Sequence, residues 1–393
     1  MPSIVDMVDI LERLESKALH IEPARCVKVR NRNASCTRCA DACTSGAITV
    51  EGNSIDIDGE KCTGCGTCTA ACPTQAIVCD KPSDEQLAEG LARSMDANGG
   101  AAAVICGRVA ARKTADVDRV AEVLCLGRVD VPSLIGAAAR GAQSIALIDG
   151  GCSTCKFRAA VPHIDATADE ANALLEAWGS DVRVSRLDAV PQELAAHDRE
   201  QATGGVSRRG FFTGVKSQAK NLATEAATYG IEKELGIAKE HATLRDTLKV
   251  GEDGCLPHGP IPRHEDLLES LFEMGEPDDV TIASHQWGSV TMDPEKCDNC
   301  GVCATFCPTG ALSKVLRDAP KKPGRPAAKG AKELECLEFR LSDCVGCGTC
   351  ADVCIGRAIT VSHDIEASRV LELEPVSMRG TKRKRGIGGA WRS

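Results

Sequence analysis

The sequence predicts a multidomain protein of mixed α+β and α/β class. Two small cysteine-rich modules are expected to flank a small parallel-sheet α/β domain, with helical linkers between them. The 393 residues exceed what one core holds, so two to four domains are expected. Most of the 23 cysteines fall toward the two ends. Between them, short apolar runs alternate with stretches of helical spacing, which is the pattern of a parallel sheet.

Composition and charge limit the partners and the cellular compartment that we expect for the chain. The formal net charge of −9 argues against nucleic acid as a partner, and no apolar stretch reaches the length of a membrane span. The opening MPSIVDMVDILERLESKAL follows an acidic amphipathic helix pattern and lacks the apolar core of a secretory signal. We therefore expect a cytoplasmic protein whose clustered cysteines are metal ligands or redox thiols rather than disulfides.

A short cysteine repeat occurs four times, twice toward each end of the chain. The copies read SCTRCADACTSGAI from Ser35, KCTGCGTCTAACPTQAI from Lys61, KCDNCGVCATFCPTGAL from Lys296 and DCVGCGTCADVCIGRAI from Asp343. The last three share C-x2-C-x2-C-x3-C, which is the bacterial ferredoxin run. Three closely spaced thiolates surround one face of a [4Fe–4S] cluster, and the fourth cysteine reaches the twin cluster. The runs are therefore expected in pairs.

Pairing the runs predicts two clusters in each module. The sets in the C-terminal module, 285–365, are Cys297, Cys300, Cys303 and Cys354, and Cys344, Cys347, Cys350 and Cys307. The regular set in the N-terminal module, within 1–85, is Cys62, Cys65, Cys68 and Cys43.

The fourth set is less regular. Asn33 stands where its leading cysteine belongs, and the nearest upstream thiol is Cys26. We assign Cys26, Cys36, Cys39 and Cys72 to this set, because a seven-residue insertion in a surface loop has a small entropic cost. The alternative is a three-cysteine [3Fe–4S] or degraded site beside a merely buried Cys26.

On these runs, residues 20–80 and 285–362 resemble bacterial-type two-cluster ferredoxin domains. The resemblance implies small modules that are organised by [4Fe–4S] clusters and carry electrons. Two alternatives are weighed against it. A lone cysteine is often only a small buried apolar residue, and zinc sites usually place two pairs far apart and often include histidine.

Residues 99–195 are expected to form the α/β domain. Four parallel strands are predicted at 101–106, 121–126, 144–149 and 182–187, with helical spacing at 131–142 and 167–179. Cys106, Cys125 and Cys152 come at or just after strand ends, and Cys155 follows on the same loop as Cys152. Because open parallel sheets bind ligands at the carboxyl ends of their strands, these four thiols should gather at one place.

Four convergent thiolates suit a [2Fe–2S] cluster, which takes two cysteines per iron. CLGRVDVPSLIGAAARGA from Cys125 and GGCSTCKF from Gly150 resemble the delta subunit of methyl-viologen-reducing hydrogenases. The resemblance implies a [2Fe–2S] domain that hands electrons to a flavin subunit of heterodisulfide-reductase type, although a single Cys106 stands where a close cysteine pair is expected. The alternatives are a dithiol of Cys152 and Cys155 at a helix start, where thiol pKa values are lowered, and buried packing.

The remaining segments are expected to connect or to stay solvated. Residues 205–280 are predicted to be a helical linker, in which Ser207 caps a helix bearing Phe211 and Phe212 and a second helix lies at 265–275. SRRGFF from Ser207 is similar to an export signal but lies mid-chain without an apolar stretch after it. The basic segments 320–332 and 366–393 predict flexible chain or, second, docking onto an acidic partner.

These observations favour an iron–sulfur electron-transfer subunit of a multi-subunit anaerobic oxidoreductase, holding four [4Fe–4S] clusters and one [2Fe–2S] cluster. It would relay electrons between a flavin, molybdenum, tungsten or hydrogenase subunit and an electron carrier, and it would hold no catalytic residue itself. An alternative of another class is a thiol or disulfide reductase that uses Cys152 and Cys155. A third is an iron–sulfur sensor that uses the basic tail.

Overall fold

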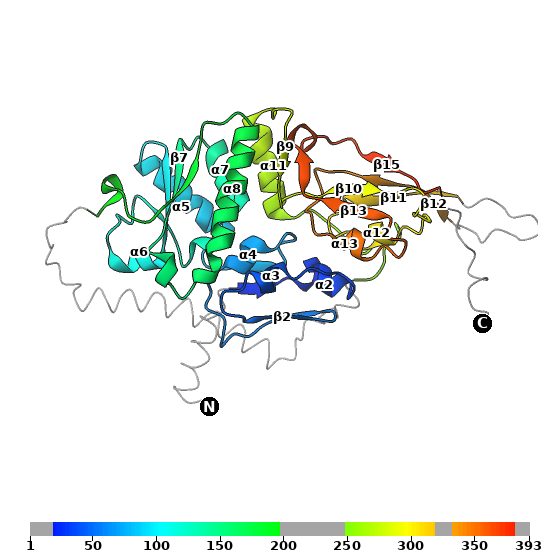
Figure 1. Ribbon diagram of the computed structural model, residues 1–393, viewed down its shortest axis with the longest axis horizontal. Helices are drawn as coiled ribbons and strands as arrows, with labels where there is room; N and C mark the ends of the chain where they lie inside the picture. Colours follow the sequence, from blue (N-terminus) through cyan, green and yellow to red (C-terminus); the bar gives the residue numbers. More distant parts are fainter. Residues whose placement is uncertain (1–18, 197–247, 319–331, 382–393) are drawn as a thin grey trace, which may run out of the picture. The chain divides into compact units, whose positions relative to one another are not determined.

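The computed structural model describes residues 19–196, 248–318 and 332–381. Described residues up to Ala195 and from Leu248 belong to one compact unit (Figure 1). The expected N-terminal helix before Leu19, the Ser207 cap with its two phenylalanines, most of the segment 320–332 and the end of the basic tail lie outside the described residues. No described helix combines the length and apolar character needed to cross a bilayer.

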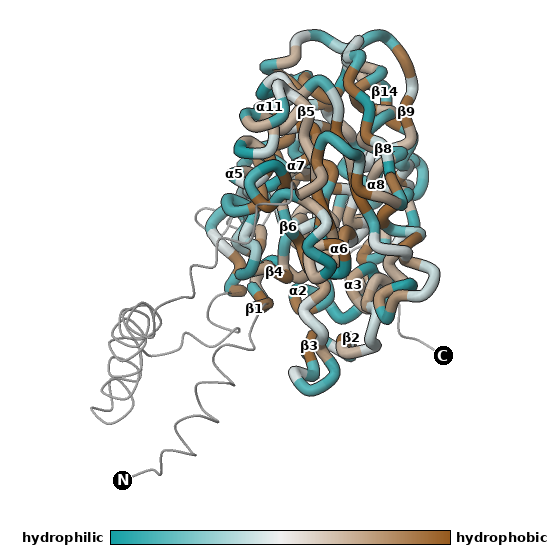
Figure 2. Tube along the Cα trace, turned by 90° about the vertical axis from the view of Figure 1, so that its left-hand side faces the viewer, coloured by the Kyte–Doolittle hydropathy of each residue, from teal (hydrophilic) through white to brown (hydrophobic). Residues whose placement is uncertain are grey.

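The central α/β domain is built on a four-stranded parallel sheet. The strand order is β6-β5-β7-β8, from Ala121–Val123, Ala101–Cys106, Ser144–Ile148 and Val184–Leu187. Val104 and Ile105 of β5 are fully buried, as expected for a strand covered on both faces. The four parallel strands expected from the apolar runs are present, and Figure 2 shows β5 as a mostly hydrophobic trace.

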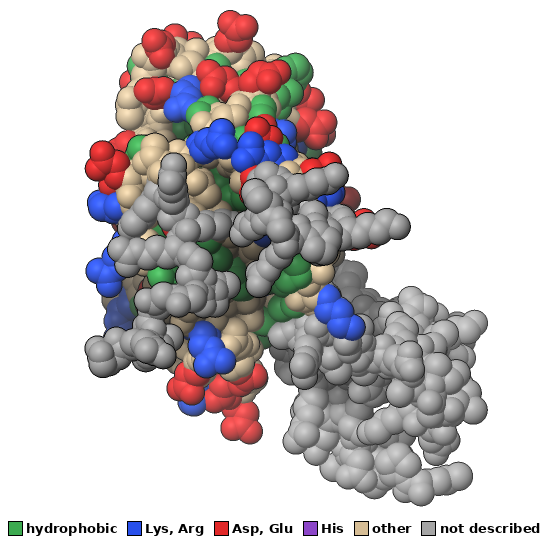
Figure 3. Space-filling model, turned by 90° about the vertical axis from the view of Figure 1, so that its right-hand side faces the viewer, with side chains coloured by type: hydrophobic (Ala, Val, Ile, Leu, Met, Phe, Trp, Pro, Cys, Tyr) green, Lys and Arg blue, Asp and Glu red, His purple; other side chains and the backbone are tan. Residues whose placement is uncertain are grey.

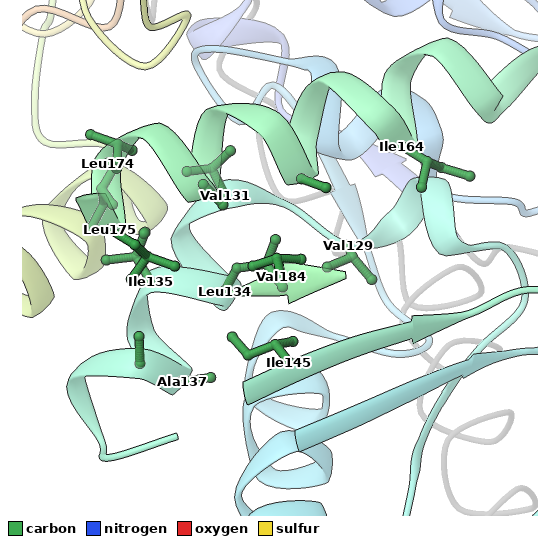
Figure 4. Close-up of a cluster of buried hydrophobic side chains, with 14 of the residues drawn as sticks. Val129, Val131, Leu134, Ile135, Ala137, Ile145, Ile164, Leu174, Leu175 and Val184 are labelled. Atoms are coloured by element: carbon green, nitrogen blue, oxygen red, sulfur yellow. The ribbon is translucent and has the colours of Figure 1, made fainter. Parts of the chain in front are cut away.

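Four helices pack on this sheet. They are α5 (Asp84–Ala97), α6 (Gly107–Arg112), α7 (Val131–Ala139) and α8 (Val161–Ala177). The Ser83 hydroxyl accepts the Gln86 backbone N–H, and the Gln86 side chain accepts the Ser83 N–H, which satisfies the first turn of α5. In the same way the Asp130 carboxylate caps α7. Figure 4 shows Leu134 of α7 beside Val184 of β8 and near Ile145 of β7, and Ile135 of α7 near Leu175 of α8.

The N-terminal module consists of two antiparallel strand pairs and short helical turns. The strands are β1 (Leu19–Ile21) with β4 (Ile77–Cys79), and β2 (Ile48–Glu51) with β3 (Ser54–Ile57). The helices are α2 (Val27–Arg30), α3 (Arg38–Asp41) and α4 (Thr67–Ala71). Because these elements are short, the cysteines make up much of the buried cluster around Ile48 and Ile77.

The C-terminal module has the same kind of organisation with longer strands. β9 (Thr281–Ala283) pairs with β14 (Asp364–Glu366), and β10 (Ser289–Met292) with β13 (Ile359–Ser362). A third sheet has the order β11-β12-β15, from Leu312–Asp318, Lys332–Phe339 and Val376–Met378. The short helices are α12 (Val302–Thr305) and α13 (Thr349–Asp352). The helix expected at 265–275 is α11 (Pro262–Met274), which contacts α7.

A buried charge network joins the N-terminal module, α11 and the central domain. Arg263 of α11 donates to the Asp84 carboxylate at 2.6 and 2.8 Å and to the Thr69 carbonyl at 2.6 Å. Arg128, only 1% exposed, also contacts Asp84 and the Asp130 carboxylate. Each charge therefore has a partner of opposite sign, which burial requires.

Candidate functional site

The three intact cysteine runs share one backbone shape. Between the first two cysteines of each run stands a residue with positive φ, namely Gly64, Asn299 or Gly346. A glycine with φ between 71° and 79° then precedes the short helix that carries the third cysteine, namely Gly66, Gly301 or Gly348. Glycine adopts this left-handed conformation without strain, so the chain can wrap tightly and turn three thiols the same way.

The irregular run reaches a comparable arrangement by another route. Thr37, at the position of Gly66, has a φ of −129°, so the left-handed turn is absent. Cys26 enters from outside the run, is 8% exposed, and lies near Cys36 and Cys72. The insertion between Cys26 and Cys36 is not plain loop, since residues 27–30 form α2. Burial raises the pKa of the Cys26 thiol, although the Val29 and Lys28 N–H groups donate to its sulfur and oppose the rise.

The fourth cysteine of every run accepts a backbone N–H. The donors and acceptors are Ala47 to Cys43, Ala76 to Cys72 and Ala358 to Cys354, each at 3.2 Å, and Leu312 to Cys307 at 3.5 Å. In three copies the donor is the alanine one residue before the end of the repeat, and in the copy from Lys296 it is the leucine that ends the repeat. Hydrogen bonds to sulfur orient a ligating thiolate and tune the reduction potential of an iron–sulfur centre.

In the N-terminal module the structure brings together both sets of four thiols. The pKa of Cys39 is raised to about 12, mainly by burial and in part by the nearby sulfurs of Cys72, Cys36 and Cys26. Burial likewise raises the pKa of Cys68, with further increases from its neighbours Cys65, Cys43, Cys39 and Cys62. Cys39 therefore lies between its own set and that of Cys68. Cys26, Cys36, Cys39 and Cys72 line one small cavity.

The C-terminal module repeats this grouping. The pKa of Cys303 is raised to about 12, mainly by burial and in part by Cys300, Cys354 and Cys297. Burial also raises the pKa of Cys350, whose neighbouring sulfurs are Cys344, Cys347, Cys307 and, from the other set, Cys303. Cys307, Cys344, Cys347 and Cys350 line a small cavity whose other walls include Val290, Leu312 and Phe339.

The central cysteines also converge, as expected from the ends of their strands. Cys106, Cys125, Cys152 and Cys155 line a cavity of about 380 Å³ at the carboxyl edge of the sheet. The pKa of Cys125 is raised to about 12, mainly by burial and in part by the nearby sulfurs of Cys65, Cys152 and Cys155. Cys152 begins a three-residue 3-10 turn, Cys152–Thr154, rather than the α-helix on which the dithiol alternative depends.

Two contacts join the three cysteine regions in an order different from the sequence. The influence of Cys65 on Cys125 places the regular N-terminal set next to the central set. At the other side, the pKa of Cys347 is raised to about 11, mainly by burial and in part by Cys307 and Cys36. The N-terminal cysteine sets thus lie between the central cysteines and the cysteines of the C-terminal module, although β9 of the C-terminal module also packs directly on α8 of the central domain.

Close backbone packing supports both contacts. A Cβ placed on Gly127, two residues after Cys125, would overlap the Thr67 hydroxyl of the N-terminal module. The Arg30 guanidinium donates to the carbonyl oxygens of Pro257 and Cys307, at 2.7 and 3.3 Å. Both junctions are therefore direct contacts between modules.

Two features of the cysteine sets are those expected of thiolates that hold iron–sulfur clusters. Two of the five sets line small cavities with apolar walls, and every fourth cysteine receives a backbone hydrogen bond. No three Cys, His, Asp or Glu side chains among the described residues gather tightly enough to hold a single metal ion. The remaining thiols, Cys79, Cys255 and Cys336, are in none of the five sets.

Known protein families match segments in both end modules. Residues 34–76 match the family described as a 4Fe-4S dicluster domain, and residues 290–313 and 337–360 each match the 4Fe-4S binding domain. The chain contains two ferredoxin-type [4Fe–4S] domains. These matches support [4Fe–4S] clusters in both modules, so this part of the expectation is confirmed.

Similar proteins include large oxidoreductases. The pyruvate-flavodoxin oxidoreductase of Enterobacter agglomerans is 37% identical over 173 residues, covering 39% of this chain and 14% of that protein. The pyruvate:ferredoxin oxidoreductase of Moorella thermoacetica is 36% identical over 84 residues, covering 19% of this chain and 7% of that protein. One subunit of the ion-translocating oxidoreductase complex of Methanosarcina acetivorans is 50% identical over 42 residues, covering 11% and 16%. The chain therefore spans a small fraction of each relative, and the similarity fits an iron–sulfur electron-transfer role in an oxidoreductase.

Some residues of the site were not anticipated from the sequence. His163, His264 and His285, which look scattered along the chain, line a cavity of about 340 Å³ together with Cys72 and Arg38. Burial lowers the pKa of each of these three histidines, which favours the neutral imidazole. No periodicity or motif marks them, because they meet only where three modules come together.

Proposed function

We propose that the chain is the iron–sulfur electron-transfer subunit of a multi-subunit anaerobic oxidoreductase of the cytoplasm. Four [4Fe–4S] clusters would be held by the end modules and one [2Fe–2S] cluster by the central domain. The proposed ligand sets, in spatial order, are Cys106, Cys125, Cys152 and Cys155; Cys43, Cys62, Cys65 and Cys68; Cys26, Cys36, Cys39 and Cys72; Cys307, Cys344, Cys347 and Cys350; and Cys297, Cys300, Cys303 and Cys354. When bound, such clusters carry single electrons.

The observation that carries the proposal is this continuous row. In each neighbouring pair of sets, one cysteine lies close enough to a cysteine of the next set for its charge to raise the pKa of that thiol: Cys65 acts on Cys125, Cys39 on Cys68, Cys36 on Cys347, and Cys303 on Cys350. Electron transfer between centres requires short distances. A row of neighbouring sets that crosses all three modules is therefore the arrangement expected of a conductor between two partners.

The sequence resemblance of the central domain supports its place in the proposal. The hydrogenase delta subunit family carries a [2Fe–2S] cluster and delivers electrons to a flavin subunit, and in this chain four thiols converge at the carboxyl edge of the sheet. We propose a catalytic partner of the flavin, molybdenum, tungsten or hydrogenase type. The proposed domain boundaries are 1–85, 99–195, 205–280 and 285–365, followed by a basic tail.

Metal analysis tests the proposal directly. Protein purified without oxygen should hold about 16 irons in the end modules and about two in the central domain, with equal acid-labile sulfide. Cys152→Ser should remove about two irons and a [2Fe–2S] signal, whereas Cys336→Ser, in a thiol outside the five sets, should leave the count unchanged. A colourless protein, or one that holds zinc, would overturn the proposal. An unchanged iron count in Cys152→Ser, with lost disulfide reduction, would favour the thiol reductase.

A further inference from the structure

The cavity of the central cysteines is surrounded by basic side chains. We call Arg108, Arg112, Lys156 and Arg158 the basic collar. Arg108 and Lys156 line the cavity itself. Arg112 donates to the carbonyl of Gly150 at 3.0 Å, and the backbone N–H of Arg158 donates to the carbonyl of Cys155, which places both beside the cysteine loop.

The charges of the collar are not neutralised by nearby acids. None of the four makes an ion pair with another described residue. The acidic side chain on the same loop, Asp149, is 5% exposed and is already paired with Arg186 at 2.8 Å. The collar therefore places four cationic side chains without an ion-pair partner at or beside the cavity, on a chain whose formal net charge is −9.

The collar lies on the side of the molecule opposite to the face drawn in Figure 3. Helix α6, which carries Arg108 and Arg112, appears at the left of Figure 1. Figure 3 shows the right-hand side, where acidic and basic side chains are interspersed. Within the collar, Leu124 is 44% exposed and lines the same cavity beside Cys125. An apolar contact at the centre with charges around it is the usual composition of a protein docking surface.

We propose that the basic collar docks an acidic electron-carrier protein against the central cysteine site. The proposal rests on the electron-transfer function, because the site makes sense for a redox partner only if the row of cysteines conducts. A carrier with carboxylates around its redox centre is attracted to the collar and repelled by the acidic remainder of the chain. Electrostatics of this kind orient the encounter and raise the association rate. Nucleic acid and anionic membranes are also negatively charged, but they have no redox centre that could exchange electrons with a cluster in the cavity.

Binding to a purified flavodoxin of net negative charge tests this proposal. Arg158→Glu and Lys156→Glu, neither of which loses a hydrogen bond made by its side chain, should each raise the Kd about tenfold at about 0.05 M salt. The difference should shrink to about twofold at about 0.5 M salt, where exposed charges are screened. The matched control is Arg93→Glu on α5, an exposed arginine with the same charge change, which should leave the Kd within about twofold of the unmodified chain. Arg158→Lys, which keeps the charge, should retain binding.

The outcomes separate this proposal from the proposed function. The iron content and spectra of each variant show whether its clusters are present. If a fully loaded variant binds the flavodoxin with an unchanged Kd, the docking proposal is wrong while the proposed function stands. A shifted reduction potential with an unchanged Kd overturns it as well, since the collar would then only tune the site. If the chain binds duplex DNA or phosphatidylserine vesicles through the collar but does not bind the flavodoxin, the proposed carrier protein is wrong and the ligand of the collar is the DNA or the membrane.

Discussion

Ser35 donates its backbone N–H and its hydroxyl to the carboxylate of Asp352, 317 residues away in the sequence, at 2.7 and 2.9 Å. Ser35 directly precedes Cys36, and Asp352 ends α13, which carries Cys350. This contact therefore holds two predicted ligand loops of different modules together. It makes the neighbouring positions of Cys36 and Cys347 a consequence of a specific polar junction.

The first prediction concerns this junction. Asp352→Asn removes the charge that accepts the Ser35 hydrogen bonds, which should weaken the junction by about 1 kcal/mol, because a half-exposed charged hydrogen bond is partly replaced by water. Hydrogen exchange should speed up around Cys36 and in α13. Asp96→Asn, in an exposed carboxylate of α5, is the control, and equal exchange in both variants would contradict the role of Asp352.

The second prediction concerns the buried charge network. Arg263→Gln leaves the carboxylates of Asp84 and Asp130 without one of their cations, so we expect a loss of about 3 kcal/mol. Arg317→Gln, which breaks an exposed pair with Glu333, should cost less than about 1 kcal/mol. The free energy of unfolding of the cluster-loaded proteins in denaturant compares the two variants. Where unfolding is irreversible, the unfolding rate is compared instead. Similar losses in the two variants would rule out a structural role for the network.

The third prediction concerns the pH dependence of the same network. Burial raises the pKa of Asp84, but the guanidinium groups of Arg263 and Arg128 lower it by more, and the net shift is downward. A carboxylate with a lowered folded pKa stabilises the fold above its unfolded pKa of about 3.9, and the stabilisation is lost as pH falls through the folded value. The difference in unfolding rate between the unmodified chain and Asp84→Asn should therefore be constant near neutral pH and diminish below about pH 4. A constant difference at all pH values would contradict this assignment.

The fourth prediction concerns Cys26. If Cys26 completes the irregular set, Cys26→Ser should lose iron and convert or remove one [4Fe–4S] signal. Cys79→Ser, in a thiol that is buried to 2% exposure and lies outside the five sets, controls for the loss of a buried sulfur. Iron analysis and electron paramagnetic resonance provide the measurement. Full iron content in Cys26→Ser would support the three-cysteine alternative instead.

The fifth prediction concerns the contact between the central and N-terminal cysteines. Gly127→Ala places a methyl group against the Thr67 hydroxyl and should cost about 2 kcal/mol of overpacking or push the two loops apart. Magnetic coupling between the central site and its neighbour should weaken. Gly59→Ala, whose added methyl group meets no atom within 4 Å, is the control. Unchanged coupling in Gly127→Ala would argue against this contact as the electron route.

The local parts of the molecule could be predicted well from the sequence. The spacing of Cys62, Cys65 and Cys68 implies a tight loop, and the run at 101–106 is strand β5 with the expected Cys106 at its end. Both depend on interactions within a few residues, namely backbone conformation and the burial of a short apolar run. The segment after Cys26 was predicted as loop but forms α2, because its helical turn buries Val27 and Val29 in the module.

By itself the sequence determined which thiols belong together within a run and which segments form the parallel sheet, since those depend on spacing and periodicity. Only the tertiary structure decided the order of the modules and the positions of Arg263, Ser35 and the basic collar. These depend on pairs of residues far apart in the chain, such as Ser35 with Asp352. Such pairs have no fixed spacing, so their contacts arise only once the surfaces of the folded modules meet.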